Sequence, residues 1–142
     1  MTTPTSPTRA ALRRVKIPIF FVDALLSATI GLLLATSAAQ LHALSGGGLA
    51  PETLRFVGLA LLPWSFHNWI TSRERPLRLT SFCIHVIVDS FWILASLWIY
   101  AHHFRSFTAV GHVSYGPQIA TVALVLFLKI QAFRERDTRR TA

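Results

Sequence analysis

Six polar residues with the potential for chemistry lie inside stretches that are otherwise strongly apolar. They are Asp23, Ser27, His67, Asn68, His85 and Asp89. Insertion scales assign roughly 2.5–3.5 kcal/mol to an acid at the centre of a membrane helix. Each acid therefore needs a partner, a proton or a ligand, and the six residues together define the candidate site.

Helical spacing places these residues on two faces that also carry small side chains. In the first apolar stretch every fourth residue is small or acidic: Asp23, Ser27, Gly31 and Ala35. In the third stretch a polar stripe recurs at helical spacing: Ser81, His85, Asp89, Trp92 and Ser96. Small residues permit close helix approach. We therefore expect the two acid-bearing faces to meet, with Asp23 and His85 at similar depth.

Three kinds of site fit this pattern. The first is an internal network in which Asp23 pairs with His85 or His67, completed by Ser27 and Asn68. The second is the site of a proton-linked small-molecule or ion carrier, the usual role of ionisable residues in membranes. The third is a metal site at His85 and Asp89, or a haem held between His67 and His85. The residues alone leave these alternatives open.

The elements that must position these side chains are four apolar stretches. Hydrophobic residues make up 52% of the chain and charged residues 14%, against about 25% charged in an ordinary soluble domain. A membrane-spanning helix needs about 20 apolar residues. We predict an all-α, four-transmembrane-helix bundle forming one domain of residues 17–133, between basic tails at 1–16 and 134–142. The predicted spans are about 17–41, 51–71, 79–101 and 116–133.

The basic residues predict the orientation. All but two of the 14 Lys and Arg residues fall in the N-terminal tail, the second connection and the C-terminal end, in which we include Lys129 with the last arginines. The two exceptions are Arg55 and Arg105. Positive residues favour the cytoplasmic side, so both termini are expected to be cytoplasmic. Because this topology accounts for the net charge of +8, no nucleic-acid partner is expected.

One alternative concerns the first span. A basic segment from Arg13 to Lys16, an apolar run and the small residues Ser37, Ala38 and Ala39 are also the pattern of a cleaved secretory signal. Cleavage would leave three spans and an outside N-terminus. Asp23 interrupts the apolar run, which is also longer than a usual signal core. The retained span is therefore the favoured interpretation.

Few signals point to enzyme or cofactor chemistry. The sequence has no G-x-S-x-G, P-loop, C-x-x-C or H-E-x-x-H motif, and its single cysteine, Cys83, lies in an apolar stretch. His102, His103 and His112 flank the third connection and form a second candidate metal site. We expect a protein without a cofactor and without a recognisable catalytic centre.

The segments DALLSATIGLLL, LRFVGLALLPW and DSFWILASLWIY resemble a widespread group of small bacterial four-helix membrane proteins of unassigned function. This resemblance implies a four-helix bundle in a bacterial inner membrane and no particular activity. We therefore expect a multi-pass inner-membrane protein acting as a non-enzymatic accessory or interaction subunit. Its expected partners are the lipid bilayer and further subunits, in a homo-oligomer or a larger membrane complex.

Overall fold

The computed structural model describes residues 19–46, 49–74 and 76–138, with side chains as far as Arg134. Within these ranges the regular secondary structure is entirely α-helical, which confirms the predicted all-α class. The four helices are α2 (Ile19–Ser45), α3 (Pro51–Arg73), α4 (Leu79–His103) and α5 (Ala109–Thr138). The predicted basic tail at 1–16, Arg75 and residues 139–142 lie outside the described part of the chain.

Three helices in the described part are long and apolar enough to cross a membrane: α2, α4 and the segment Ala109–Arg134 of α5. Helix α3 is continuous through Pro63 and carries more polar residues, among them Ser65, His67 and Asn68. The chain therefore has three helices typical of a membrane protein, and α3 falls outside this group.

Helix α5 begins before Gly116, where the fourth span was predicted to start. The hydroxyl of Thr108 accepts a hydrogen bond from the Gly111 N–H at 3.2 Å, the geometry of an N-cap side chain bonded to the third helical residue. Pro117 then lies inside the helix rather than at its start. The predicted start was wrong because the Gly-Pro pair does not initiate the helix; the capping Thr108 initiates it earlier.

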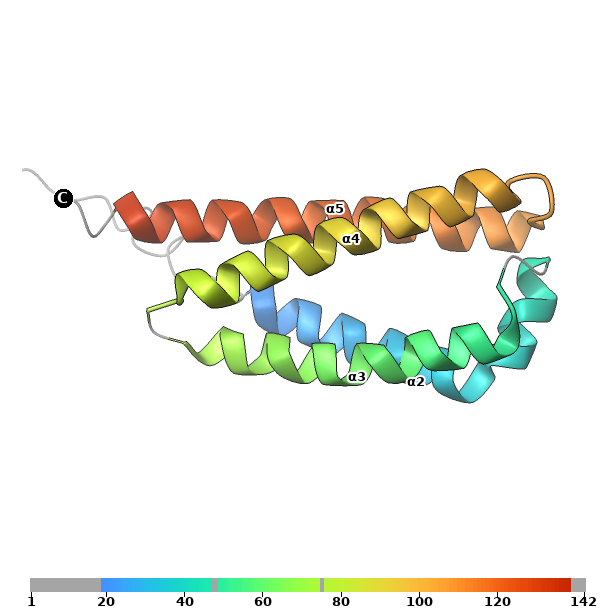
Figure 1. Ribbon diagram of the computed structural model, residues 1–142, viewed down its shortest axis with the longest axis horizontal. Helices are drawn as coiled ribbons and strands as arrows, with labels where there is room; N and C mark the ends of the chain where they lie inside the picture. Colours follow the sequence, from blue (N-terminus) through green and yellow to red (C-terminus); the bar gives the residue numbers. More distant parts are fainter. Residues whose placement is uncertain (1–18, 47–48, 75, 139–142) are drawn as a thin grey trace, which may run out of the picture.

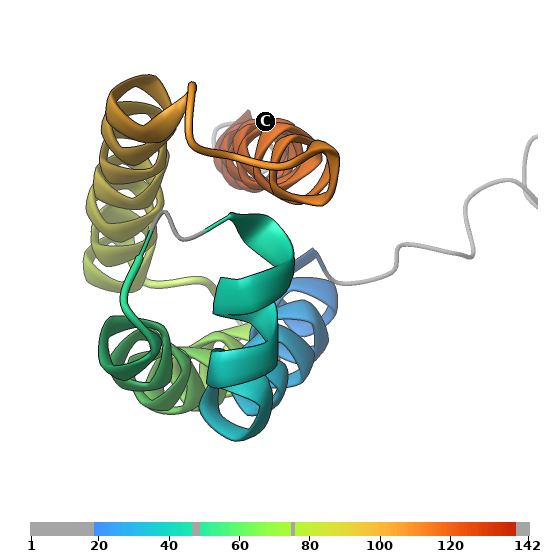
Figure 2. The same cartoon turned by 90° about the vertical axis from the view of Figure 1, so that its right-hand side faces the viewer.

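The helices are arranged as two antiparallel hairpins, α2 with α3 and α4 with α5 (Figure 1). Seen end-on, the four helices occupy the corners of a square in chain order (Figure 2). Helices α2 and α4 begin at the same end of the bundle at which α3 and α5 terminate. We call it the basic end, because Arg73, Arg78 and Arg134 lie there.

The hairpin of α2 and α3 is closely packed through glycine. A Cβ atom on Gly58 would lie 2.6 Å from both the Gly31 carbonyl oxygen and the Ala35 nitrogen. No real side chain tolerates such contacts, so the two backbones touch here because Gly58 has none. The predicted seam of small residues on α2 thus meets α3, its neighbour in the chain.

The second hairpin is held to the first at the end opposite the basic end. Helix α2 bends at Ser37, whose φ and ψ are −117° and 21°, and terminates at Gly46 with φ of 86°, a left-handed conformation that favours glycine. The Thr108 N–H then donates a hydrogen bond to the Ser45 carbonyl at 3.1 Å. The Thr108 hydroxyl donates a second one to the Leu44 carbonyl at 2.6 Å. These bonds join the end of α2 to the start of α5.

Candidate functional site

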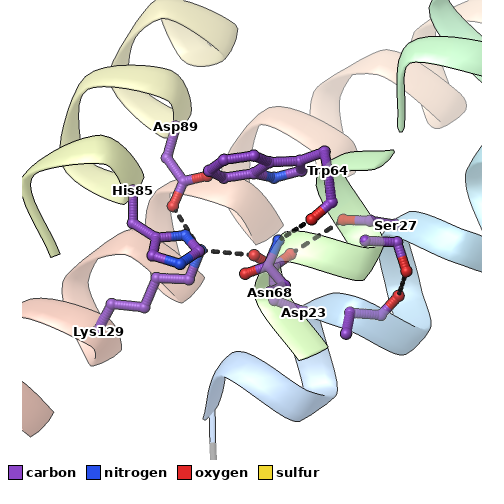
Figure 3. A network of polar contacts seen from close by, with 9 residues as sticks. Asp23, Ser27, Trp64, Asn68, His85, Asp89 and Lys129 are labelled. Carbon is purple, nitrogen blue, oxygen red and sulfur yellow. Dashed lines mark hydrogen bonds and ion pairs between the residues drawn. The ribbon is translucent and has the colours of Figure 1, made fainter. Parts of the chain in front are cut away.

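A completely buried lysine lies at the centre of the candidate site. The exposed fraction of Lys129, on α5, is 0%, although the residue precedes the charged C-terminal end of its helix. Its ammonium nitrogen Nζ lies 2.5 Å from Asp23 Oδ2 on α2 and 2.7 Å from Asp89 Oδ2 on α4. Figure 3 shows the three side chains converging from three helices. We call Lys129, Asp23, Asp89 and His85 the ion cluster.

Neighbouring polar groups hold the members of the ion cluster in place. The second oxygen of Asp23, Oδ1, accepts a hydrogen bond from the Ser27 hydroxyl one helical turn away, at 3.3 Å. The Ser65 hydroxyl of α3 donates to the Ala24 carbonyl at 2.7 Å, which fixes α3 beside the acid-bearing turn of α2. Ser27 thus orients the Asp23 carboxylate, and Ser65 holds the turn of α2 that carries it.

His85 completes the cluster from the same helix as Asp89. Its Nδ1 lies 3.3 Å from Lys129 Nζ. Because an ammonium can only donate, Nδ1 must accept, which places the proton of a neutral imidazole on Nε2. The exposed fraction of His85 is 0%, and its ring packs against those of Phe20, Trp64 and His67, with centroids 4.8, 4.8 and 5.1 Å away.

The ion cluster and this aromatic shell draw on all four helices. Lys129 Nζ also lies 5.6 Å from the Phe20 ring centroid and 5.7 Å from that of Trp64, a range in which a cation is attracted to a ring face. Aromatic rings thus surround the charges where water would otherwise solvate them. Electrostatic interactions are correspondingly stronger in such an environment than in water.

Several buried polar atoms beside the cluster have no hydrogen-bond partner among the described residues. They are His67 Nε2, Asn68 Oδ1, Thr71 Oγ1 and His85 Nε2. A buried polar atom without a partner costs about 1–3 kcal/mol, and ordered water commonly satisfies such groups. Since Thr71 lies near the last turn of α3, these atoms form a polar strip between the cluster and the basic end.

The charges of the ion cluster do not balance when both acids are ionised. Two carboxylates face one ammonium, and the neutral tautomer of His85 adds no charge. One negative charge therefore remains in a low-dielectric setting, where an uncompensated charge costs several kcal/mol. Binding of one proton or one cation restores neutrality.

A large cavity adjoins the carboxylate side of the ion cluster. Its volume is about 900 Å³, it is partly open, and side chains from all four helices line it. Its polar lining includes Asp23, Ser27, Asp89 and Gln118, while most of the remaining wall is aliphatic or aromatic. An apolar cavity with a few convergent polar groups is the usual form of a small-molecule site.

The structure brings together three of the six predicted site residues directly. Ligand atoms of Asp23, His85 and Asp89 all lie within 4.8 Å of one another, and Ser27 bonds to Asp23. His67 reaches the site through its ring contact with His85. Asn68 is buried nearby, but its amide donates to the Trp64 carbonyl at 3.1 Å rather than to an acid.

By its sequence position Lys129 counts with the basic residues of the C-terminal end, but the structure buries it inside the bundle. The predicted pair of Asp23 with His85 is replaced by two contacts to Lys129, which lies between them. The signal was present in the sequence: Lys129 lies within the predicted span 116–133 at about the depth of Asp23. Grouping it with Arg134 obscured this position.

The geometry disfavours both metal interpretations. Lys129 Nζ is within bonding distance of all three of Asp23, His85 and Asp89, so the ammonium occupies the position that a metal ion would need. The His67 and His85 rings lie 5.1 Å apart at an interplanar angle of 33°, which leaves no room for a porphyrin between them.

The outer histidines do not converge in the described part of the chain. His112 Nδ1 lies 3.0 Å from the Tyr100 hydroxyl, whereas His102 packs on Trp98 with ring centroids 4.3 Å apart. Among described residues, the group with metal-ligating spacing is the one in the ion cluster. These histidines are thus aromatic packing partners at the end of the bundle.

Comparisons with protein-family models, with curated proteins and with solved structures found no match to this chain.

Proposed function

We propose that this protein is a proton-linked carrier of a small, largely apolar molecule. The observation that carries the proposal is the cavity of about 900 Å³, whose lining includes both carboxylates of the ion cluster. A molecule bound there contacts the groups that must exchange a proton or a cation to stay neutral. Binding and protonation are therefore linked thermodynamically.

The polar strip supports a route for the proton. His67 and His85 have adjacent rings, and the unpartnered atoms of Asn68 and Thr71 continue towards the basic end. Histidine and bound water are effective proton relays. Under the proposal, protons exchange through this strip while the molecule enters through the partly open cavity.

The proposal places the protein in a bacterial inner membrane as a four-span bundle, with the basic end and both termini in the cytoplasm. The positive-inside rule supports this orientation. The fourth span is α3, which lies against α2 at Gly58 and buries Asn68 and Thr71. The cavity is only partly enclosed by the four helices, which favours a homo-oligomer or a larger complex as the working unit.

A proton-linked carrier differs from an accessory subunit in what it requires of Asp89. In an accessory subunit the ion cluster would serve only to hold the helices together. Replacement of Asp89 by Asn leaves Asp23 and Lys129 as a balanced pair, so the protein should remain folded. A carrier would nevertheless lose its proton-exchanging group.

The test uses liposomes that contain the protein and a trapped pH indicator. Apolar organic molecules of cationic, neutral and anionic character are added outside under a pH gradient. Proton-linked carriage predicts that at least one class changes the internal pH, and that Asp89→Asn abolishes the change. Glu52→Gln, which removes an exposed carboxylate at the start of α3, is the matched control. No protein-dependent change with any class would favour the accessory subunit.

A further inference from the structure

The charge on the cavity wall is of one sign. Asp23 and Asp89 are the ionisable side chains among the residues that line the cavity. Lys129 is completely buried behind them and is not part of the lining. A molecule in the cavity thus meets the residues that carry the carboxylates, whereas Lys129 is not part of the wall.

The excess charge determines which ligand is stabilised at this end of the cavity. A cation compensates the negative charge that Lys129 leaves uncompensated. An anion would add a second uncompensated charge, and a neutral molecule would leave the first in place. Like charges juxtaposed in a binding site cost several kcal/mol, so charge complementarity favours a cationic group.

The remaining walls suit an apolar body that carries this charge. Trp64, Phe91 and Trp92 line the cavity near the acids, and aromatic faces attract cations with little hydration. Aliphatic side chains such as Ile30 and Leu33 continue the wall along α2. The volume of about 900 Å³ lies within the range of about 300–1,000 Å³ that is typical of sites for drug-sized ligands.

We infer that the cavity binds a lipophilic organic cation with one positive charge, its charged centre beside Asp23 and Asp89 and its apolar body along α2 and α5. This inference rests on the proposed carrier function and names the class of molecule carried. When the cation enters, the carboxylic acid of the neutral cluster releases its proton to water and its carboxylate pairs with the cation. Charge balances, and one proton leaves for each cation bound.

The experiment measures binding of tetraphenylphosphonium to the full chain in lipid nanodiscs, with empty nanodiscs as the partition control. Tetraphenylborate, an anion of the same shape, and neutral triphenylphosphine oxide are the comparison probes. We expect saturable binding of the cation only, with release of one proton per cation into a weakly buffered solution. The apparent Kd should rise as the pH falls, by up to about tenfold per unit for one competing proton.

Two pairs of variants locate the binding site. Asp89→Asn should weaken binding of the cation by at least about tenfold, since a partly desolvated charge pair is lost, while Glu52→Gln leaves it unchanged. Ala60→Trp places a large ring in the cavity wall and should also weaken binding. Leu59→Trp, at the adjacent exposed position outside the lining, should not.

The outcomes separate this inference from the proposed function. Saturable binding of tetraphenylborate or of the neutral probe, sensitive to Ala60→Trp but without binding of the cation, would overturn the cationic class and leave the carrier proposal standing. Binding of none of the three probes by folded protein would overturn the inference. If the liposome test also showed no protein-dependent pH change, the carrier proposal would fall with it.

Discussion

The ammonium nitrogen of Lys129 lies 2.7 Å from Asp89 Oδ2, with both residues buried. This contact joins α5 to α4 inside the membrane-spanning part of the bundle, and the contact with Asp23 extends it to α2. Removal of the ammonium leaves both buried carboxylates without a cation, whereas removal of all three charges leaves none uncompensated.

Lys129→Met should lower the free energy of unfolding by about 3–5 kcal/mol, because two buried carboxylates lose their cation. The triple variant Lys129→Met, Asp23→Asn, Asp89→Asn should recover most of this loss. Denaturant titration in detergent, followed by circular dichroism, measures both. A triple variant as unstable as the single one would show that the methionine fails to pack and that charge is not the cause.

A pair of double-mutant cycles distinguishes the observed partner of Asp23 from the predicted one. The coupling energy between Asp23→Asn and Lys129→Met should be about 0.5–3 kcal/mol, the range for residues in direct contact. Asp23→Asn and His85→Gln should couple more weakly, since the structure connects them through Lys129. The reverse order would mean that Asp23 pairs with the histidine directly.

Replacement of glycine by a larger residue should have opposite effects on stability at Gly58 and at Gly116. Gly58→Val should destabilise the protein by about 1–3 kcal/mol by forcing α2 and α3 apart, since even a Cβ atom would lie 2.6 Å from the Gly31 carbonyl. Gly116→Ala, where a Cβ atom meets nothing within 4 Å, should stabilise α5 by up to about 1 kcal/mol. Thermal unfolding in detergent measures both, and equal effects would contradict the described packing.

The orientation of the chain is testable by reporter fusion. A reporter fused after Ala142 should be active only in a cytoplasmic format, and one inserted at Gly47 only in an outside format, because the basic residues flank alternate connections. Activity of the Ala142 fusion in the outside format would contradict the four-span topology and place the basic end outside the cell.

Much of the fold was predictable from hydrophobic periodicity and charge, because both can be read from short segments of the sequence. Apolar length predicted the helices, and helical spacing placed His85 and Asp89 on one face. The packing partners were not predictable in this way. The seam of Gly31 meets Gly58 of the neighbouring helix, a pairing that a pattern within one helix does not specify.

The cluster was only partly predictable for a related reason. The depths of Asp23 and His85 followed from counting residues, and the same count would have placed Lys129 beside them. The positive-inside rule instead assigned every basic residue near a helix end to the membrane surface. A lysine within a predicted span is better treated as a candidate partner for an acid at the same depth.

The central claim is that the ion cluster holds one exchangeable proton beside the cavity. Infrared difference spectroscopy of the protein in lipid, recorded between high and low pH over the range in which it stays folded, measures this proton through the carbonyl band of a protonated carboxylic acid. We predict one such band per chain that disappears at high pH, is absent in Asp89→Asn and is kept in Glu52→Gln. A wild-type spectrum without a titrating band, or an unchanged band in Asp89→Asn, would contradict the claim.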